Sequence, residues 1–316
     1  MADPEPPAPP LVSCIIIFLD EERYLAEAIE SIVAQGYRNW ELLLVDDGSS
    51  DASGEIAATY ARESNGQIRY LTHPDRENRG MSASRNLGIA NAQGELIAFL
   101  DGDDSWFPDK LQRQVALLGE HPEAQMVCGA TLYWHQWNQG GSADRLVRTG
   151  DILSGKDAGL SLLEPDRLYR PPELMKRLYP IGRGVTPSMS GIMVRRALLD
   201  AIGGFEESFR GLFEDQVFRA KVFLGWPVYV SSDCFDRYRQ HGESCWQSTR
   251  ATPGAREARS RYLAWLGRYV NRSGCRDSVV RSGLRRLVLR DRHPRLAMVL
   301  RGLRARLGGG RRARLY

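Results

Sequence analysis

The sequence predicts an α/β protein built on a mostly parallel sheet with helices on both faces, followed by a helical C-terminal extension. Short apolar runs alternate with stretches of helical periodicity from Leu11 to Asp104, which is the pattern of a doubly wound sheet. The runs are rich in valine, isoleucine and leucine, as expected for strands covered on both faces. Two of them end in aspartates, at the edge of such a sheet where ligands bind.

Four strands and three helices account for the first part of the chain. The first helix is expected to open with Asp20, Glu21 and Glu22, because carboxylates suit a helix N-terminus. Ser50 or Asp51 can cap the second helix. The predicted strands are residues 11–19, 40–45, 68–71 and 96–100, and the third helix spans residues 82–92.

The second part of the chain is predicted to contain shorter elements around a long irregular segment. We expect a helix over 106–118, with Pro108 in its first turn, and a strand over 126–134. Residues 136–187 are rich in glycine, proline and charge, and long insertions of this kind are often functional. The remaining expected elements are strands over 190–194 and 228–231 and helices over 195–202 and 213–224.

Two acidic clusters follow strands of the predicted sheet. Asp46 and Asp47 come after the second strand, and Asp101-Gly-Asp-Asp104 comes after the fourth. Parallel strands present their carboxyl ends on one edge, so the clusters should share a cleft. Asp101 and Asp103 are two residues apart in an extended segment and can converge on one cation, Mg²⁺ or Mn²⁺, held jointly with substrate phosphates. Solvated turns without a ligand are the alternative.

The charge of the chain is unevenly distributed. Residues 255–316 hold 18 arginines, three acids and no lysine, a net charge of +15, whereas the whole chain carries +4. Arginine-rich helices are expected there, with breaks at Gly274 and Pro294. We prefer the interpretation that they form a cap on the acidic body. The alternative is a helix on anionic lipid, with Leu284, Leu287 and Leu300 inserted.

The composition also excludes several classes of protein. Apolar residues make up 42% and charged residues 26% of the chain, as in ordinary globular proteins. Five cysteines without a C-x-x-C pair favour reduced thiols in a cytosolic protein, and no apolar run is long enough to span a membrane. Residues 1–10 are expected to be a disordered leader rather than a signal peptide. Neither a G-x-G-x-x-G after the first strand nor a P-loop is present.

Four stretches of the chain resemble, in order, the motifs of the family 2 inverting glycosyltransferases of the GT-A fold. They are residues 12–53, with VDDGSSDAS, residues 78–111, with NRGMSASRNLGI and FLDGDDSW, residues 203–218 (GGFEESFRGLFEDQVF) and residues 238–244 (YRQHGES). The resemblance implies a Rossmann-like GT-A domain over 11–250, with a nucleotide-sugar-binding half (11–112) and an acceptor half (113–250). It does not reach the arginine-rich extension, residues 251–316.

The resemblance implies a nucleotide-diphospho-sugar donor and assigns residues to it. The loop after the first strand should wall the nucleoside, and Asp47 should accept a hydrogen bond from the base. The nucleotide stays open, because Ile17, Leu19 and Asp20 replace the family's usual proline, aromatic residue and asparagine. Arg85 should face the donor and could pair with phosphate, or be a solvated helix charge. The implied donor-binding residues are Ile17, Phe18, Leu19, Glu21, Asp47, Arg85, Asp101 and Gly102.

The resemblance also assigns metal-binding and catalytic roles. Asp101-Gly-Asp103 matches the family's D-x-D motif, in which Asp103 should bind the metal directly and Asp101 should hold the ribose or support the metal. His241 should complete the metal site, with a surface imidazole as the alternative. Glu214 and Asp215 match the acidic motif near the acceptor, with Asp215 as general base. They could equally be partners of a helix dipole, but the preceding Gly-Gly-Phe-Glu favours catalysis.

The predicted function is therefore metal-dependent, inverting sugar transfer to a glycan or lipid-linked acceptor, in cell-envelope or polysaccharide synthesis. The expected location is cytoplasmic, with peripheral contact of the basic tail at the inner face of the membrane. Two rivals remain. A sugar nucleotidyltransferase would need a basic, glycine-rich loop after the first strand, where residues 18–22 are acidic. A non-catalytic protein could bind nucleic acid through its tail, but no nucleic acid is expected, since the aspartates of the motifs are all present.

Overall fold

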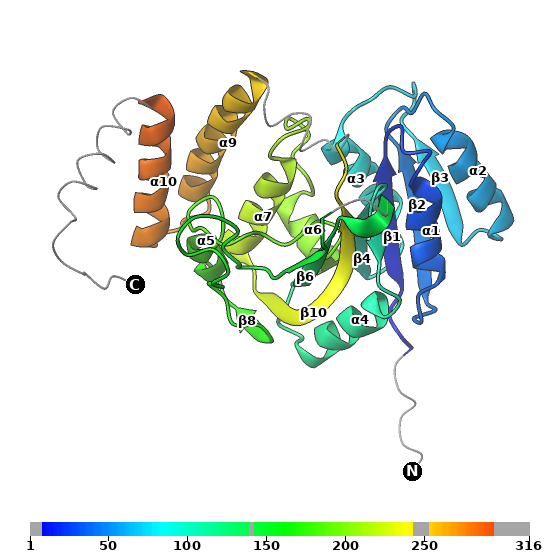
Figure 1. The fold of residues 1–316 in the computed structure, drawn as a ribbon, viewed down its shortest axis with the longest axis horizontal. Helices are drawn as coiled ribbons and strands as arrows, with labels where there is room; N and C mark the ends of the chain where they lie inside the picture. Colours follow the sequence, from blue (N-terminus) through cyan, green and yellow to red (C-terminus); the bar gives the residue numbers. More distant parts are fainter. Residues whose placement is uncertain (1–7, 139–141, 243–252, 294–316) are drawn as a thin grey trace, which may run out of the picture.

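The computed structural model describes residues 8–138, 142–242 and 253–293 of the 316-residue chain. Within these ranges the strands form one ten-stranded sheet in the order β3-β2-β1-β4-β9-β6-β10-β5, with β7 beside β6 and β8 beside β10. Helices flank the sheet, and α9 and α10 lie at the end of the molecule away from β3 (Figure 1). Most of the expected leader, the break at Pro294 and Leu300 lie outside the described residues.

The first half of the sheet is parallel, as the alternation of strands and helices predicts. The pairs β1–β2, β1–β4 and β2–β3 all run parallel, which confirms the prediction for the first part of the chain. The elements are β1 (Val12–Phe18), α1 (Leu25–Val33), β2 (Trp40–Asp46), α2 (Ser53–Glu63), β3 (Ile68–Thr72), α3 (Met81–Asn91) and β4 (Leu96–Asp101).

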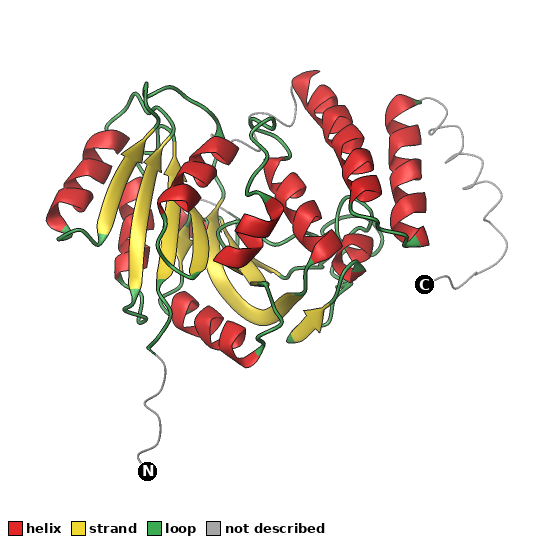
Figure 2. Cartoon of the chain, turned by 180° about the vertical axis from the view of Figure 1, so that it is seen from behind, coloured by secondary structure: helices red, strands yellow, loops and turns green. Residues whose placement is uncertain are grey.

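The second half of the sheet is mixed, because β9 runs antiparallel to both β4 and β6. Figure 2 shows the same sheet from behind, with helices on its faces. The elements are β5 (Ser105–Trp106), α4 (Lys110–Glu120), β6 (Met126–Trp134), the 3₁₀-helix η1 (Gln136–Asn138), β7 (Arg145–Val147), β8 (Arg167–Tyr169), α5 (Glu173–Arg177), β9 (Met193–Arg195), α6 (Arg196–Ile202), α7 (Glu214–Gly225), β10 (Val228–Arg239), α9 (Pro253–Arg272) and α10 (Ser278–Arg292).

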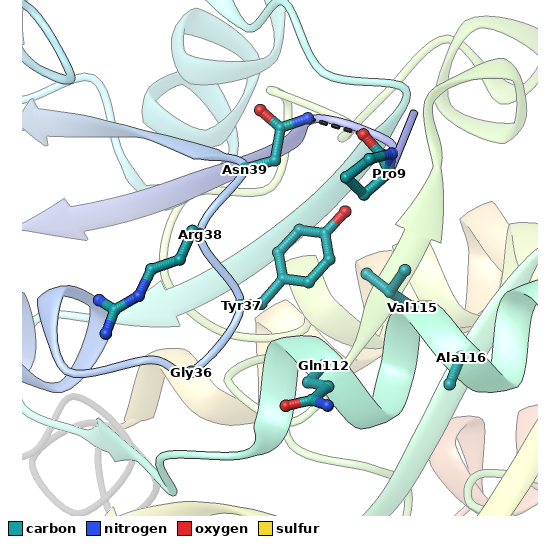
Figure 3. Close-up of a pocket in the computed structure, with 8 residues that line it drawn as sticks. All are labelled: Pro9, Gly36, Tyr37, Arg38, Asn39, Gln112, Val115 and Ala116. Carbon is teal, nitrogen blue, oxygen red and sulfur yellow. Dashed lines mark hydrogen bonds between the residues drawn. The ribbon is translucent and has the colours of Figure 1, made fainter. Parts of the chain in front are cut away.

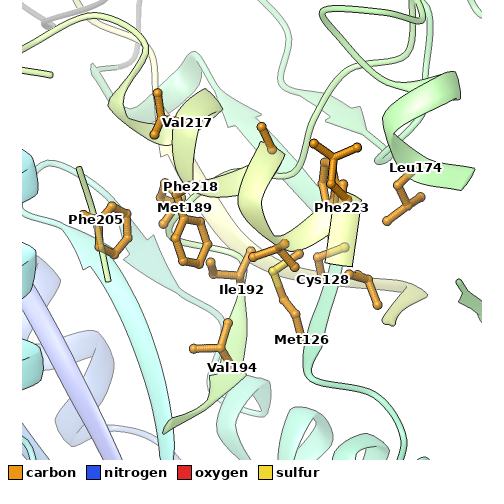
Figure 4. Packing of buried hydrophobic residues seen from close by; sticks show 14 of the residues in the cluster. Met126, Cys128, Leu174, Met189, Ile192, Val194, Phe205, Val217, Phe218 and Phe223 are labelled. Carbon is orange, nitrogen blue, oxygen red and sulfur yellow. The ribbon is translucent and has the colours of Figure 1, made fainter. Parts of the chain in front are cut away.

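The buried apolar side chains form two clusters. Successive residues of a strand point to opposite faces, so Ile15 of β1 belongs to one cluster and Ile16 to the other. The cluster that contains Ile15 includes the stacked rings of Phe205 and Phe218, whose centroids are 5.4 and 6.5 Å from that of Phe99. Figure 4 shows this packing beneath α7. This packing connects the N-terminal half of the chain to α7, the helix that carries Glu214 and Asp215.

Two of the expected helices begin several residues later than predicted. The first, α1, begins at Leu25, because Asp20 and Glu22 brace a neighbouring loop: Asp20 accepts from the backbone of Ser50, and Glu22 from the backbone of Ala52. The helix expected from residue 106 begins at Lys110, because residues 105–106 form β5 and pair with β10. In both cases contacts to distant segments hold the residues outside the helix.

Two of the expected strands have bounds that differ by several residues from the prediction. The strand β9 begins at Met193 rather than residue 190, and the hydroxyl of Ser190 donates to Asp104 instead. The strand expected to end at residue 231 continues to Arg239, because irregularities after Val230 let β10 bend and stay paired with β6. This extension carries the chain on to His241.

The C-terminal helices pack on the body of the protein. Tyr262 and Leu266 of α9 are fully buried in the cluster beneath α7, and Leu284 of α10 belongs to it too. Leu287 packs against the same cluster. The alternative that Leu284 and Leu287 insert into lipid is therefore wrong, since both face the protein. Among the described residues, no helix is both long and apolar enough to cross a membrane.

Candidate functional site

The two acidic clusters lie on the same edge of the sheet. The strand β1 runs between β2 and β4, and Ile17 near its end pairs with Val45 on one side and Asp101 on the other. Asp46 and Asp47 therefore flank the end of β1 on one side and Asp101 on the other, as the parallel topology predicts.

The loops that leave β1 and β4 contact each other. The backbone N–H of Gly102 donates to the carbonyl of Ile17 at 3.1 Å. A Cβ at Gly102 would lie only 2.8 Å from the Cβ of Phe18, so this approach needs glycine. Ile17 and Phe18 are buried in the core, whereas Leu19 is 39% exposed. Glu21 is half-buried, and its N–H donates to Ser53. Of the expected nucleoside wall, Leu19 and Glu21 are the residues that reach the surface.

Asp47 organises the loop before α3. Its carboxylate accepts from the backbone N–H groups of Arg79, at 2.8 Å, and Gly80, at 2.9 Å. It also accepts from the hydroxyl of Ser84 at 3.0 Å. Asp47 is 5% exposed, so most of its hydrogen-bonding capacity serves the fold. The predicted contact with the base of a donor stays a prediction.

Arg85 connects the donor motif to the acceptor motif. Its guanidinium donates to Asp101 at 2.7 Å and to Glu214 at 2.8 Å. The side chain is 1% exposed, so the alternative of a solvated helix charge is wrong. Burial, together with the neighbouring Asp215, raises the pKa of Glu214, and Arg85 opposes that rise. The buried guanidinium of Arg85 therefore holds the end of β4, at Asp101, close to the start of α7, at Glu214.

Asp103 and His241 form a second contact across the site. The Nε2 atom of His241 lies 2.9 Å from an oxygen of Asp103, although the two residues are 138 positions apart. The histidine side chain is 7% exposed, which rules out a surface imidazole. Its Nδ1 atom is buried and has no hydrogen-bond partner among the described residues. The carboxylate of Asp103 and the Nε2 atom of His241 are ligand types that fit a divalent cation, and they face each other.

Glu214 and Asp215 begin α7, as the sequence predicts. Glu214 is 5% exposed, whereas the side chain of Asp215 is 29% exposed. Arg219, one turn later on α7, forms an ion pair with Asp215 and is itself buried. The two acids therefore differ in surroundings. Glu214 is held inside the protein, and Asp215 can be reached from solvent.

Two arginines of the site, Arg219 and Arg239, were not predicted from the sequence. Arg219 stands four residues after Asp215, and an i, i+4 pair on a helix could have revealed it. Arg239 donates its N–H to Asp104 and its Nε–H to the carbonyl of Asp103, and its guanidinium lies over the rings of Tyr24, Trp134 and Trp137. No local pattern indicates these contacts, because they depend on the bend of β10.

Within the described residues, one pocket lies at the amino ends of the strands and another at their carboxyl ends. A cavity of about 590 Å³ lies where β2 begins, among residues that include Tyr37, Asn39 and Gln112 (Figure 3). It is at the amino ends of the strands, away from the aspartates, so it does not belong to the site. A smaller hollow of about 320 Å³ lies at the carboxyl edge and is lined in part by Asp46 and Arg76.

Comparison with known sequences identifies the family. The sequence profile of glycosyl transferase family 2 matches residues 13–202. The chain belongs to glycosyl transferase family 2. EpsE of Bacillus subtilis (strain 168) is 40% identical over 133 residues, which cover 42% of this family 2 chain and 47% of EpsE. TuaG of the same strain is 31% identical over 150 residues, 47% of this chain and 57% of TuaG. The chain thus spans about half the length of these curated relatives.

Solved structures confirm the GT-A fold of this family 2 protein. Residues 1–349 of TarS from S. aureus match with a TM-score of 0.63 at 18% identity, over 90% of this chain and 72% of that one. The same TarS segment is also known in complex with UDP-GlcNAc. The mannosyltransferase PcManGT from Pyrobaculum calidifontis, in complex with GDP-Man and Mn²⁺, matches with a TM-score of 0.56 at 18% identity, over 91% and 71% of the chains. At these identities the likeness concerns the fold alone.

Proposed function

We propose that this family 2 member is a metal-dependent, inverting glycosyltransferase that moves a sugar from a nucleotide-diphospho-sugar to an acceptor hydroxyl. One observation carries the proposal. Arg85 joins Asp101 of the donor motif to Glu214 of the acceptor motif, so both motifs meet in one site. A non-catalytic binding protein would not need Glu214 of the acceptor motif to be joined to Asp101 of the donor motif.

Asp215 is the general base of the proposed reaction. Its carboxylate is partly exposed, and Arg219 holds it in place. It would take the proton of the acceptor hydroxyl as that oxygen attacks the anomeric carbon, opposite the leaving diphosphate, so that configuration inverts. Glu214 is buried and bound to Arg85, which suits a role in holding the first turn of α7 rather than in proton transfer.

Asp103 and His241 are the proposed metal ligands, with Asp101 beside them. Support comes from their direct contact and from the similar fold of PcManGT, whose structure is a complex with Mn²⁺. When bound, Mn²⁺ or Mg²⁺ neutralises the charge of the leaving diphosphate. Among the described residues no three His, Cys, Asp or Glu side chains could hold an ion by themselves.

Leu19 and Glu21 are the side chains proposed to contact the nucleoside of the donor, and Asp47 is proposed to contact its base. Two proteins of similar fold form complexes with UDP-GlcNAc and GDP-Man, so uridine and guanosine diphosphate sugars are the first donors to examine. The name of TuaG refers to teichuronic acid biosynthesis. It supports a glycan or lipid-linked acceptor in cell-envelope or polysaccharide synthesis. The proposed location is cytoplasmic, with the arginines of α9 and α10 at the inner face of the membrane.

A donor screen tests the proposed function. The full chain, with Mn²⁺ or Mg²⁺, is mixed with UDP-, GDP- and dTDP-sugars, and thermal stabilisation and slow release of free nucleotide are followed. We expect a metal-dependent shift with one nucleotide class, and its loss in Asp103→Ala. A folded protein that no donor stabilises would contradict the proposal and favour a non-catalytic role.

A further inference from the structure

The helix α9 reaches the acceptor motif through one aromatic contact. Tyr262 of α9 is fully buried, and its ring lies parallel to that of Phe213, with centroids 5.1 Å apart and an interplanar angle of 11°. Phe213 directly precedes Glu214 and Asp215. The family profile ends at residue 202, so neither the acceptor motif nor α9 lies within the matched part.

The backbone of Phe213 is in a conformation that its side chain disfavours. Its φ is +73°, in the left-handed region that bulky residues rarely adopt. The residue before a helix usually has an extended backbone and a capping side chain, and Phe213 has neither. Its carbonyl nevertheless accepts the first helical hydrogen bond, from Val217 at 3.0 Å. Strain of this kind persists only where the surroundings fix the residue.

Of the Tyr262 side chain, the ring is the part that contacts Phe213. The hydroxyl is buried and has no hydrogen-bond partner among the described residues. Burial, followed by the nearby Tyr179 and Asp215, raises its pKa, so the group stays neutral. A buried hydroxyl without a partner is unfavourable for stability. The stacking and the position of the hydroxyl can therefore be separated by experiment.

We propose that α9 is a working part of the site and that Tyr262 is its positioning residue. By stacking on Phe213 it holds the left-handed turn that starts α7, and this turn sets where Asp215 stands relative to Asp101. The proposal rests on the proposed function, because it assigns Asp215 the role of base. It predicts that loss of the stack slows transfer while donor binding is kept, since Asp47 and Asp103 lie on other elements and Asp101 keeps its contact with Arg85 of α3.

The test compares full-length variants that differ in what they remove. Tyr262→Phe keeps the ring, and Tyr262→Leu removes it. Leu266→Ala is the matched control, because Leu266 is also fully buried on α9, in the same cluster. We expect Tyr262→Phe to turn over at about the wild-type rate. Tyr262→Leu should lose on the order of 10²-fold in kcat with an unchanged Kd for donor and Mn²⁺, because small misplacements of a reacting group cost this much.

A second pair of variants separates positioning from general loss of stability. Glycine adopts positive φ without strain, so in a Phe213→Gly background the turn no longer depends on Tyr262. We expect the effect of Tyr262→Leu on kcat to shrink about tenfold there, as coupled residues do in a double-mutant cycle. Two results would overturn this inference and leave the proposed function standing. Either Tyr262→Leu lowers kcat equally in both backgrounds, or it gives the same kcat as Leu266→Ala at the same folded fraction. A wild-type protein without any transfer or donor hydrolysis would overturn the proposed function as well.

Discussion

At the scale of single residues, the site depends on buried ion pairs. If one member of such a pair is removed, water cannot take its place beside the other. Arg85 is 1% exposed and contacts two carboxylates, while Asp103 contacts His241. The acid proposed as base, Asp215, is the more exposed of the two at the start of α7. Single substitutions should therefore separate residues that hold the site from the residue that moves a proton.

Asp215→Asn tests the general base. The amide keeps the shape of the side chain but cannot take a proton, so kcat should fall by roughly 10²–10⁴-fold. The affinity for donor and metal should stay unchanged in a titration of donor binding. Asp200→Asn, at an exposed acid, is the control and should keep wild-type turnover. Wild-type turnover in Asp215→Asn would show that another residue is the base.

Arg85→Met tests the buried ion pair. Removing the cation leaves Glu214 buried without its partner, which typically costs about 3–5 kcal/mol. Denaturant unfolding should show this loss of stability. Adding Glu214→Gln should recover part of it, because the remaining side chain is then neutral. If the double variant is no more stable than Arg85→Met, Glu214 is not the group that Arg85 compensates.

At the scale of elements, polar side chains hold neighbouring strands in register at the edge opposite the site. Glu41 of β2 accepts from the hydroxyl of Ser13 in β1, from Arg69 in β3 and from the N–H of Gln93 before β4. Burial by itself raises the pKa of Glu41, but these hydrogen bonds outweigh it and the pKa lies below its ordinary value. The carboxylate thus stabilises the parallel half of the sheet when ionised.

Glu41→Gln should therefore change how stability depends on pH. A pKa that is lower in the folded than in the unfolded protein gives stability that is present above the unfolded value and lost as pH falls through the folded one. The variant should be less stable than wild type at pH 7, and the difference should shrink toward pH 3. Urea unfolding at several pH values measures this. Glu63→Gln, at an exposed glutamate, is the control. A difference that does not change with pH would contradict the prediction.

At the scale of the whole molecule, α9 and α10 combine an apolar inner face with a basic outer one. Leu284 and Leu287 pack inward, whereas Arg285, Arg286 and Arg290 are exposed. Leu284 and Leu287 are therefore not free to insert into a membrane, whereas Leu289 of the same helix is 59% exposed.

The full chain should float with vesicles that contain anionic phospholipid and not with neutral ones. Each arginine near an anionic surface contributes about 1 kcal/mol, so reversing Arg285, Arg286 and Arg290 to glutamate should weaken flotation strongly. High salt should do the same, since exposed charges are screened. Arg62→Glu, at an exposed arginine of α2, is the control. Flotation that survives both the triple variant and high salt would exclude these arginines as the contact.

The sequence itself determined the alternation of strands and helices and the edge on which the aspartates gather. Apolar runs such as residues 96–100 specify buried strands locally, and parallel topology brings the ends of β2 and β4 to one side. The tertiary structure decided which partners the charges have. Arg85 and Glu214 are 129 positions apart and Asp103 and His241 are 138 apart, so no local pattern contains these contacts. It also decided that α9 enters the core, where Tyr262 is fully buried and stacks on Phe213, a residue far away in the sequence.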